Sequence, residues 1–218
     1  MRVVNLKIDG ALTKFKMPTC WDEVSIGQYS DLMKAIDKEG SSEIELMIKS
    51  LEALVGIDGG VLSKAPLKQI KAAYSELSDL TKVMPTNELS RVVEIDGVEY
   101  GIIPDFDDLS LGEFVDLDNY LQDSWNNLDK IFAVLYRKVT NRKDVSYTIE
   151  DYSMDNIKDR RKLFKDRLSI DTVYGALVFF YTIGSEYIEN TLSYLEEENR
   201  SLKKTNPGSK RIKQKEKA

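Results

Sequence analysis

Histidine is absent from this chain of 218 residues, and cysteine occurs once, as Cys20. Without histidine the chain lacks the commonest general base, the usual partner of a serine or cysteine nucleophile, and the commonest zinc ligand. A single cysteine cannot form an internal disulfide, so nothing in the sequence favours an oxidising compartment. Any catalysis would therefore depend on carboxylate, lysine or tyrosine side chains.

Long hydrophobic runs are also missing. The most apolar stretch, residues 174–183, has about half of the roughly 20 residues that a membrane-spanning helix needs, and residues 1–5 lack the apolar core of a signal peptide. Hydrophobic residues make up 42% and charged residues 31% of the chain, proportions that argue against global disorder. We therefore expect a folded protein without a membrane segment that is made and used in a cytoplasm.

The net charge of −6 is unevenly distributed along the chain. Residues 201–218 are rich in lysine, contain no aromatic side chain and include Asn206-Pro207-Gly208-Ser209, so we expect a basic flexible tail. Two interpretations stay open: attraction to nucleic-acid phosphates, or a tail that either solubilises the protein or contacts the acidic remainder of the chain. In the first, the residues in contact with nucleic acid would be Lys203, Lys204, Lys210, Arg211 and Lys213.

An internal repeat is the most informative feature, because a missed repeat misassigns the whole fold. Residues 21–29 (WDEVSIGQY) match residues 106–114 (FDDLSLGEF) without gaps, and every position is identical or chemically similar. Upstream of each copy stands an Ile-Asp-Gly sequence followed by a proline. The sequence therefore predicts one structural unit used twice.

Each copy of the repeat contains the signature of a helix start. Ser25 precedes Gln28 by three residues, and Ser110 precedes Glu113 by the same spacing, which is the pattern of a capping box. An apolar residue just before each serine and an aromatic residue four positions after it form a hydrophobic staple. We predict helices that begin at residues 26 and 111.

The Asp-Gly pairs predict two β-hairpins. Asp9-Gly10 lies between the alternating stretches 3–8 and 11–16, and Asp96-Gly97 lies between residues 92–95 and 98–102. Asp-Gly is favoured in two-residue type I′ turns, where both residues have positive φ. Pro18 and Pro104 then end the two ribbons.

Helical periodicity covers most of the remaining chain. We predict further helices over residues 44–55, 128–139, 154–168 and 171–200, the third with a solvated face at 159–162. Another helix is predicted to start at a cap at Ser63, with Pro66 in its first turn. Loops are predicted at 57–60 and 141–144, and a linker at 84–87. The predicted fold is α+β and predominantly α-helical, with two β-hairpin-plus-helices repeats (1–84 and 85–200), a long C-terminal helix and the basic tail 201–218.

Two groups of apolar residues are candidates for a protein interface. Trp21 and Phe106 stand four residues before the caps, where they either seal each hairpin to its helix or line a binding groove. Tyr187, Leu192 and Leu195 follow one stripe of the C-terminal helix, which either packs within the monomer or meets a partner or a second copy of the chain.

No catalytic or metal-binding motif is recognisable. Asp105, Asp107 and Asp108 lack the alternation, the central glycine and the final glutamate of an EF-hand loop, and phosphate-binding and nucleophile-elbow motifs are absent. We expect a protein that is not an enzyme and has no cofactor or metal. A carboxylate-based enzyme is the minor alternative.

The doubled pattern of aromatic, Asp, acid, apolar, Ser, apolar, Gly, Gln or Glu, and aromatic, within residues 18–36 and 104–121, resembles small helical proteins of tailed bacteriophages. Tail assembly chaperones are the nearest such family. The resemblance implies a non-enzymatic protein that binds other virion proteins during or after particle assembly, in the host cytoplasm or the virion. The alternative is a virion component or DNA-associated protein that uses the basic tail.

Overall fold

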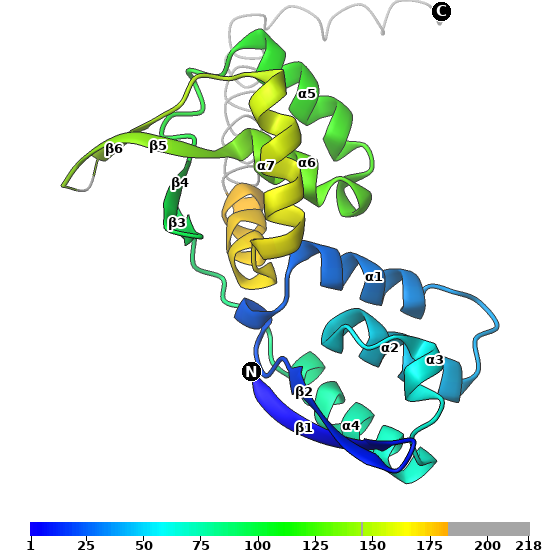
Figure 1. The fold of residues 1–218 in the computed structure, drawn as a ribbon. Coiled ribbons are helices and arrows are strands. Elements are labelled where there is room, and N and C mark those ends of the chain that lie inside the picture. The colour runs from blue at the N-terminus through cyan, green and yellow to red at the C-terminus, as the bar shows by residue number, and fades with distance from the viewer. Residues whose placement is uncertain (145, 183–218) are drawn as a thin grey trace, which may run out of the picture. The chain divides into compact units, whose positions relative to one another are not determined.

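The structure is a computed structural model that describes residues 1–144 and 146–182 (Figure 1). Residues 1–176 form one compact unit, and residue 177 begins a second. The fold is α+β and predominantly helical, as the sequence predicts. The predicted tail and most of the predicted C-terminal helix lie outside the described residues.

Both predicted hairpins are confirmed. Strands β1 (Arg2–Ile8) and β2 (Ala11–Met17) pair in antiparallel register, and β3 (Val92–Ile95) pairs with β4 (Val98–Ile102) in the same way. The turn residues have positive φ in each case, 49° and 84° in the first hairpin and 51° and 78° in the second. These values are those that a type I′ turn requires and that Asp-Gly adopts with little strain.

The first repeat packs its hairpin against a group of short helices. These are α1 (Ile26–Ile36), α2 (Glu43–Val55), α3 (Gly59–Leu62) and α4 (Leu67–Ser78), followed by the 3₁₀ turn η2 (Leu80–Lys82). Figure 1 shows β1 lying along α4, and α1 packs on α2. The core between them includes Leu6, Met17, Leu32, Leu51, Leu54, Leu62, Ile70 and Leu77, each at most 4% exposed.

Two sequence predictions in this repeat are wrong. The second half of the segment predicted as a loop, 57–60, begins α3, because the Asp58 carboxylate accepts hydrogen bonds from the N–H groups of Gly60 and Val61 and so caps a single helical turn. Ser63 ends α3 instead of capping the next helix. That next helix, α4, starts after Pro66, whose fixed φ suits a helix entry.

The second repeat carries a larger sheet than predicted. Residues 136–139, predicted as helix, belong to β5 (Tyr136–Lys143), and the predicted polar loop forms part of a hairpin with β6 (Ser146–Ile149). The sheet has the antiparallel order β3-β4-β5-β6. Helix α6 (Leu128–Leu135) is shorter than the predicted helix 128–139. It ends at Leu135 because the next residue, Tyr136, pairs with Ile102 of β4.

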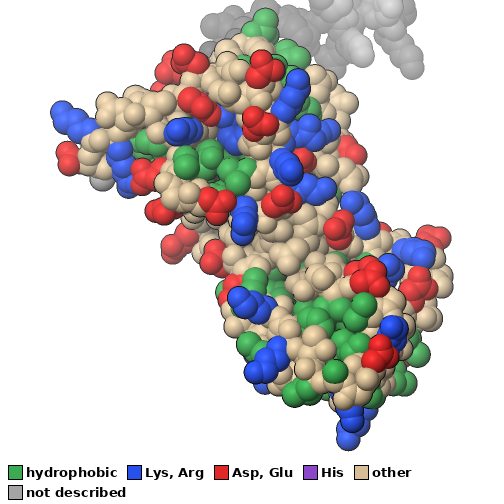
Figure 2. Space-filling model, viewed as in Figure 1, with side chains coloured by type: hydrophobic (Ala, Val, Ile, Leu, Met, Phe, Trp, Pro, Cys, Tyr) green, Lys and Arg blue, Asp and Glu red, His purple; other side chains and the backbone are tan. Residues whose placement is uncertain are grey.

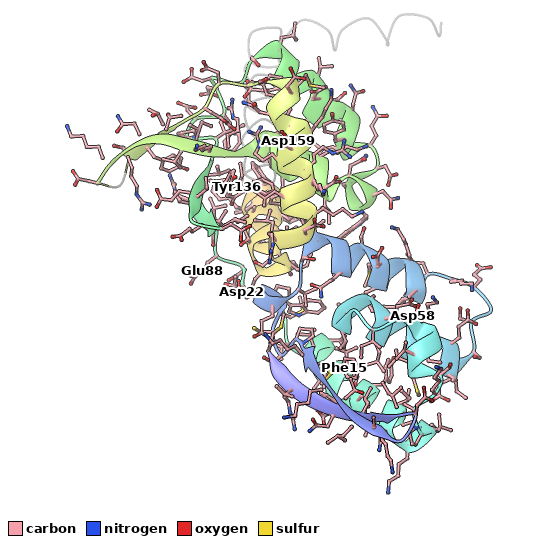
Figure 3. All side chains as sticks on the ribbon, in the orientation of Figure 1. Phe15, Asp22, Asp58, Glu88, Tyr136 and Asp159 are labelled. Atoms are coloured by element: carbon pink, nitrogen blue, oxygen red, sulfur yellow. The ribbon has the colours of Figure 1, made fainter. Side chains whose placement is uncertain are left out.

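Tyr136 anchors this sheet to the helices, as Figure 3 shows. Its ring stacks on Phe132 of α6 at 5.9 Å, and its buried hydroxyl donates to the carbonyl of Ser90 at 2.6 Å. Beside it, Phe164 of α7 (Met154–Arg167) meets Tyr100 edge-to-face at 5.2 Å. These aromatic rings form the core of the second repeat and hold α6 and α7 against the sheet.

Backbone hydrogen bonds join the two repeats. The N–H of Ile26 donates to the carbonyl of Leu168 at 3.1 Å, and the N–H of Ile170 donates to the carbonyl of Val24 at 2.8 Å. A helix begins at residue 170 and continues to residue 182, the last described residue. Its Gly175 touches the carbonyl of Glu88, so a side chain there would collide with the backbone. This contact explains why the helix contains glycine at that position.

Candidate protein-binding surface

Both predicted capping boxes are formed. The N–H groups of Gln28 and Glu113 each donate to the hydroxyl of the preceding cap serine at 3.3 Å. In return, Ser25 N–H donates to Gln28 Oε1 at 2.9 Å and Ser110 N–H donates to Glu113 Oε2 at 2.7 Å. Helices α1 and α5 (Leu111–Leu121) therefore begin where the sequence predicts.

The second polar atom of each box residue makes a different tertiary contact. Gln28 Nε2 donates to the carbonyl of Leu54 at 3.0 Å, near the C-terminal end of α2. Glu113 Oε1 instead forms an ion pair with Arg137 Nη2 of β5 at 2.7 Å, without the alignment of a hydrogen bond. An amide can donate to a carbonyl, whereas a carboxylate only accepts. The choice between Gln and Glu in the repeat thus matches the partner that each helix meets.

Charged and polar side chains lie beneath α5. The side chains of Glu113 and Arg137 are only 5% and 9% exposed. Asp116 accepts a hydrogen bond from the hydroxyl of Tyr152, whose pKa is raised by burial and then by this bond. The Tyr152 ring also contacts Gly112, so it packs under the first turn of the helix. These contacts fix α5 through its polar face.

A second buried ion pair supports the same region. Arg160 of α7 donates from Nε to the carbonyl of Ala133 at 2.9 Å and pairs with Glu150. Burial lowers the pKa of the Arg160 guanidinium, and the charge of Glu150 opposes that shift. The prediction that residues 159–162 form a solvated face is therefore wrong for Arg160, which is 5% exposed. The carbonyl and the carboxylate accept from Nε and Nη1, while Nη2 is buried without a hydrogen-bond partner among the described residues.

The outward side of α5 is apolar. We call this surface the α5 face, and it consists of Leu111, Phe114, Val115 and Leu121, which are 79%, 59%, 46% and 55% exposed. Their spacing of three, four and seven residues places them on one side of a helix. The staple predicted with Leu109 therefore leaves most of Phe114 in solvent. Helix α5 thus buries Glu113 and leaves these four apolar side chains in solvent, unlike an ordinary surface helix. Asp118 is exposed among them, and Leu117 and Tyr120 are half-buried.

The chain segment that carries the α5 face is acidic. Residues 104–129 contain no lysine or arginine. The exposed carboxylates of this segment include Asp107, Asp108, Asp118 and Asp123. The sequence contains the signal for this surface, namely an apolar helical pattern inside a long stretch without lysine or arginine. Taken alone, the apolar pattern predicts a helix that faces the core, so the surface was not predicted.

The structure describes two of the residues predicted as a protein interface, Trp21 and Phe106. Trp21 is 8% exposed, donates from Nε1 to the carbonyl of Val83 at 2.6 Å, and meets Tyr29 edge-to-face at 6.1 Å. These contacts are those of the packing alternative. Phe106 is half-buried. Tyr187, Leu192 and Leu195 lie outside the described residues, as do the candidate nucleic-acid contacts Lys203, Lys204, Lys210, Arg211 and Lys213.

The acidic segment before α5 forms a turn. The Asp105 carboxylate accepts from the N–H of Asp107 at 3.0 Å. Within the described ranges 1–144 and 146–182, no three histidine, cysteine or acidic side chains gather in a manner that could hold a metal ion. No helix in this part of the chain is both long and apolar enough to cross a membrane.

We compared the chain with known protein families, with curated proteins and with solved structures. None of the three comparisons found a match. The candidate function is therefore drawn from α5 and the residues that hold it in place.

Proposed function

We propose that this chain is a non-catalytic protein that binds another protein through the α5 face. The observation that carries the proposal is the reversed burial of α5, whose Glu113 is buried while Leu111 and Phe114 are in solvent. Contiguous apolar side chains on a surface are typical of interaction sites. A helix fixed through its polar side cannot turn that surface inward without breaking the buried ion pair to Arg137.

The charge around the α5 face selects the kind of partner. The segment that carries the apolar residues has exposed carboxylates such as Asp118, and no lysine or arginine occurs between residues 104 and 129. Complementary charge favours a partner whose apolar ridge is flanked by lysine or arginine, such as a basic amphipathic helix. Symmetric pairing of two α5 faces would place carboxylates against carboxylates, so a second copy of the chain is disfavoured as the occupant.

The finer proposal is that this partner is a virion protein of a tailed bacteriophage. It is supported by the resemblance of residues 18–36 and 104–121 to tail assembly chaperones. Residues 104–121 contain the whole of the α5 face, so the exposed apolar surface lies within the resembling segment. The chain would act on unassembled or assembled virion proteins, in the host cytoplasm or in the particle.

Quantitative capture tests the proposal. The wild-type chain, the double variant Leu111→Gln/Phe114→Gln and a control variant Leu67→Gln are immobilised and exposed to lysates of phage-infected and uninfected cells. Leu67 is a suitable control because it is 49% exposed on α4, away from α5. We expect a basic partner from the infected lysate whose recovery falls about tenfold for the double variant and is unchanged for the control.

Other outcomes separate the proposal of protein binding through the α5 face from the finer proposal of a phage virion partner. Recovery of the same α5-dependent partner from uninfected cells would support protein binding and contradict the phage role. Equal recovery by the wild type and the double variant would contradict both. Sedimentation of the purified chains adds a further test. If the wild type and the control form a dimer and the double variant does not, the α5 face binds a second copy of the chain.

A further inference from the structure

A cleft of about 250 Å³ lies between α1 of the first repeat and three elements of the second repeat. Those elements are α6, α7 and the 3₁₀ turn η3 (Ser124–Asn126). Its lining includes the basic side chains Lys34, Lys130, Arg161 and Lys165 and one carboxylate, Asp129. Figure 2 shows Lys and Arg side chains near α6 and α7 on the face that it draws. The cleft therefore has an excess of positive charge, in contrast to the acidic segment that precedes it in the chain.

Part of this positive charge is available to a ligand, although Lys34 pairs with Asp31 at 3.4 Å. Arg161 uses only Nε for its ion pair with Asp129 at 3.1 Å, which leaves its terminal amino groups outside that contact. Lys130 Nζ stands 5.4 Å from the centre of the Tyr120 ring, a contact that consumes no hydrogen-bond donor. Within the part of the chain that the structure describes, Lys165 forms no ion pair. Several donors can therefore reach one anion.

An exposed aromatic ring borders the same cleft. Trp125 is 61% exposed, and its ring centre lies 6.2 Å from that of Tyr29. A second hollow, lined by Tyr29, Met33 and Asp37, adjoins the other side of Trp125 and shares Lys34 with the first. A large indole that is left in solvent beside a group of cations provides a stacking surface for a planar ring.

The walls of the cleft are held in place by backbone contacts. The hydrogen bonds from Ile26 to Leu168 and from Ile170 to Val24 fix the start of α1 against the end of α7. Gly27 allows this approach, because a Cβ atom at that position would lie 2.9 Å from the carbonyl oxygen of Lys165. The positions of the α1 and α7 walls of the cleft are therefore set by the fold before any ligand arrives.

We propose that this cleft binds a nucleotide, with its base stacked on Trp125 and its phosphate between Lys130, Arg161 and Lys165. Stacking on an indole suits every base, and lysine and arginine donors suit phosphate oxygens. The same chemistry is presented by a free nucleotide and by a single strand of nucleic acid. An acidic peptide would satisfy the cations but has no planar ring for Trp125. The site is independent of the protein-binding role of the α5 face.

Tryptophan fluorescence provides a direct test, since Trp21 is buried and Trp125 is exposed. The full chain is titrated with ATP, with a short deoxythymidine oligonucleotide, with sodium phosphate and with a tetraglutamate peptide. We expect ATP and the oligonucleotide to quench the emission and to bind at least about tenfold more tightly than phosphate or the peptide. A steeper salt dependence for the oligonucleotide would identify a strand as the source, and tighter binding of ATP would identify a free nucleotide.

Variants locate the binding in the cleft, with affinities measured by calorimetry. Trp125→Ala should weaken ATP binding about tenfold, with partial recovery in Trp125→Phe, and Lys165→Gln should weaken it about fivefold. Lys71→Gln, on the exposed side of α4, is the matched control and should leave the affinity unchanged. Absence of quenching at millimolar ATP and oligonucleotide, equal affinity in Lys165→Gln and Lys71→Gln, or a peptide affinity equal to that of ATP would each overturn the proposal.

Discussion

Helices α1 and α5 begin with the same capping box, yet they bury different residues of it. The residue after the cap serine is Ile26 in α1, which is 3% exposed, and Leu111 in α5, which is 79% exposed. Conversely, the third residue of α5 is the buried Glu113, whereas its counterpart Gln28 is half-buried. Two nearly identical stretches of sequence therefore fold into the same local structure and present it to different surroundings.

This difference separates two kinds of information. The capping box involves only residues within four positions of each other, so it forms in both copies whatever surrounds it. The side that a helix buries depends instead on groups that the fold brings from elsewhere. For α1 these are the core of the first repeat and the carbonyl of Leu54, and for α5 they are Arg137 and Tyr152. The comparison between the two helices can be tested residue by residue.

The largest contrast is expected at the first helical residue. Replacing Ile26 by Ala should lower the free energy of unfolding by about 3–4 kcal/mol, because it leaves a cavity in the core. The matched change Leu111→Ala should alter it by less than about 0.5 kcal/mol, since this side chain is in solvent. Equilibrium unfolding in urea measures both. Similar losses for the two variants would mean that α5 is buried as α1 is.

At the third helical residue, the larger loss in the free energy of unfolding is expected in α5 instead of α1. Glu113→Gln removes the charge that accompanies buried Arg137, and we expect a loss of about 3 kcal/mol in the free energy of unfolding. The matched change Gln28→Glu places a carboxylate near the carbonyl of Leu54 in a partly exposed site, at a cost of about 1 kcal/mol. The double variant Glu113→Leu/Arg137→Met should recover most of the stability lost in Glu113→Gln. If it recovers none, the ion pair is not the reason for the loss.

The shared glycine provides a third comparison. A Cβ atom at Gly27 would lie 2.9 Å from the carbonyl oxygen of Lys165, whereas one at Gly112 would make an ordinary 3.5 Å contact with the Tyr152 ring. We expect Gly27→Ala to lower the unfolding free energy by about 2 kcal/mol. Gly112→Ala should change it by less than about 1 kcal/mol, toward greater stability because alanine favours helix. Thermal unfolding of the two variants checks the order.

The smallest expected effects, those of the two cap serines on the free energy of unfolding, should be nearly equal in α1 and α5. Ser25→Ala and Ser110→Ala each remove one cap, and each should lower the free energy of unfolding by about 1 kcal/mol. The double variant should lose the sum of the two, because the caps share no partner. Denaturation of the three variants in urea measures this additivity. Changes within about 0.2 kcal/mol of zero would contradict the role of the two serines as stabilising helix caps.

The features that could be predicted from the sequence are those with a strong local signal. Asp-Gly between alternating stretches predicted both hairpins, and the serine boxes predicted the first residue of α1 and of α5. The end of α2 at Gly56, whose φ is 74°, follows from the freedom of glycine to adopt this conformation. Each of these signals acts through the backbone of its own few residues, so the rest of the fold hardly affects it.

The features that were missed depend on distant partners. Helical periodicity continues from Leu128 into Val139, and only the pairing of Tyr136 with Ile102 shows that the helix stops and β5 begins. Arg160 lies in a run of charged residues, and only the carbonyl of Ala133 and the carboxylate of Glu150 explain its burial. The cleft beside Trp125 is made by elements from both repeats, and no pattern within either repeat predicts it.

By itself, the sequence determined where the chain turns and where its capped helices begin, because those choices are settled by φ preferences and by hydrogen bonds between neighbouring residues. The tertiary structure alone decided that α5 turns its glutamate inward and its leucine and phenylalanine outward. The reason is that a buried carboxylate needs a buried cation, and Arg137 is brought beneath α5 only when β5 joins the sheet.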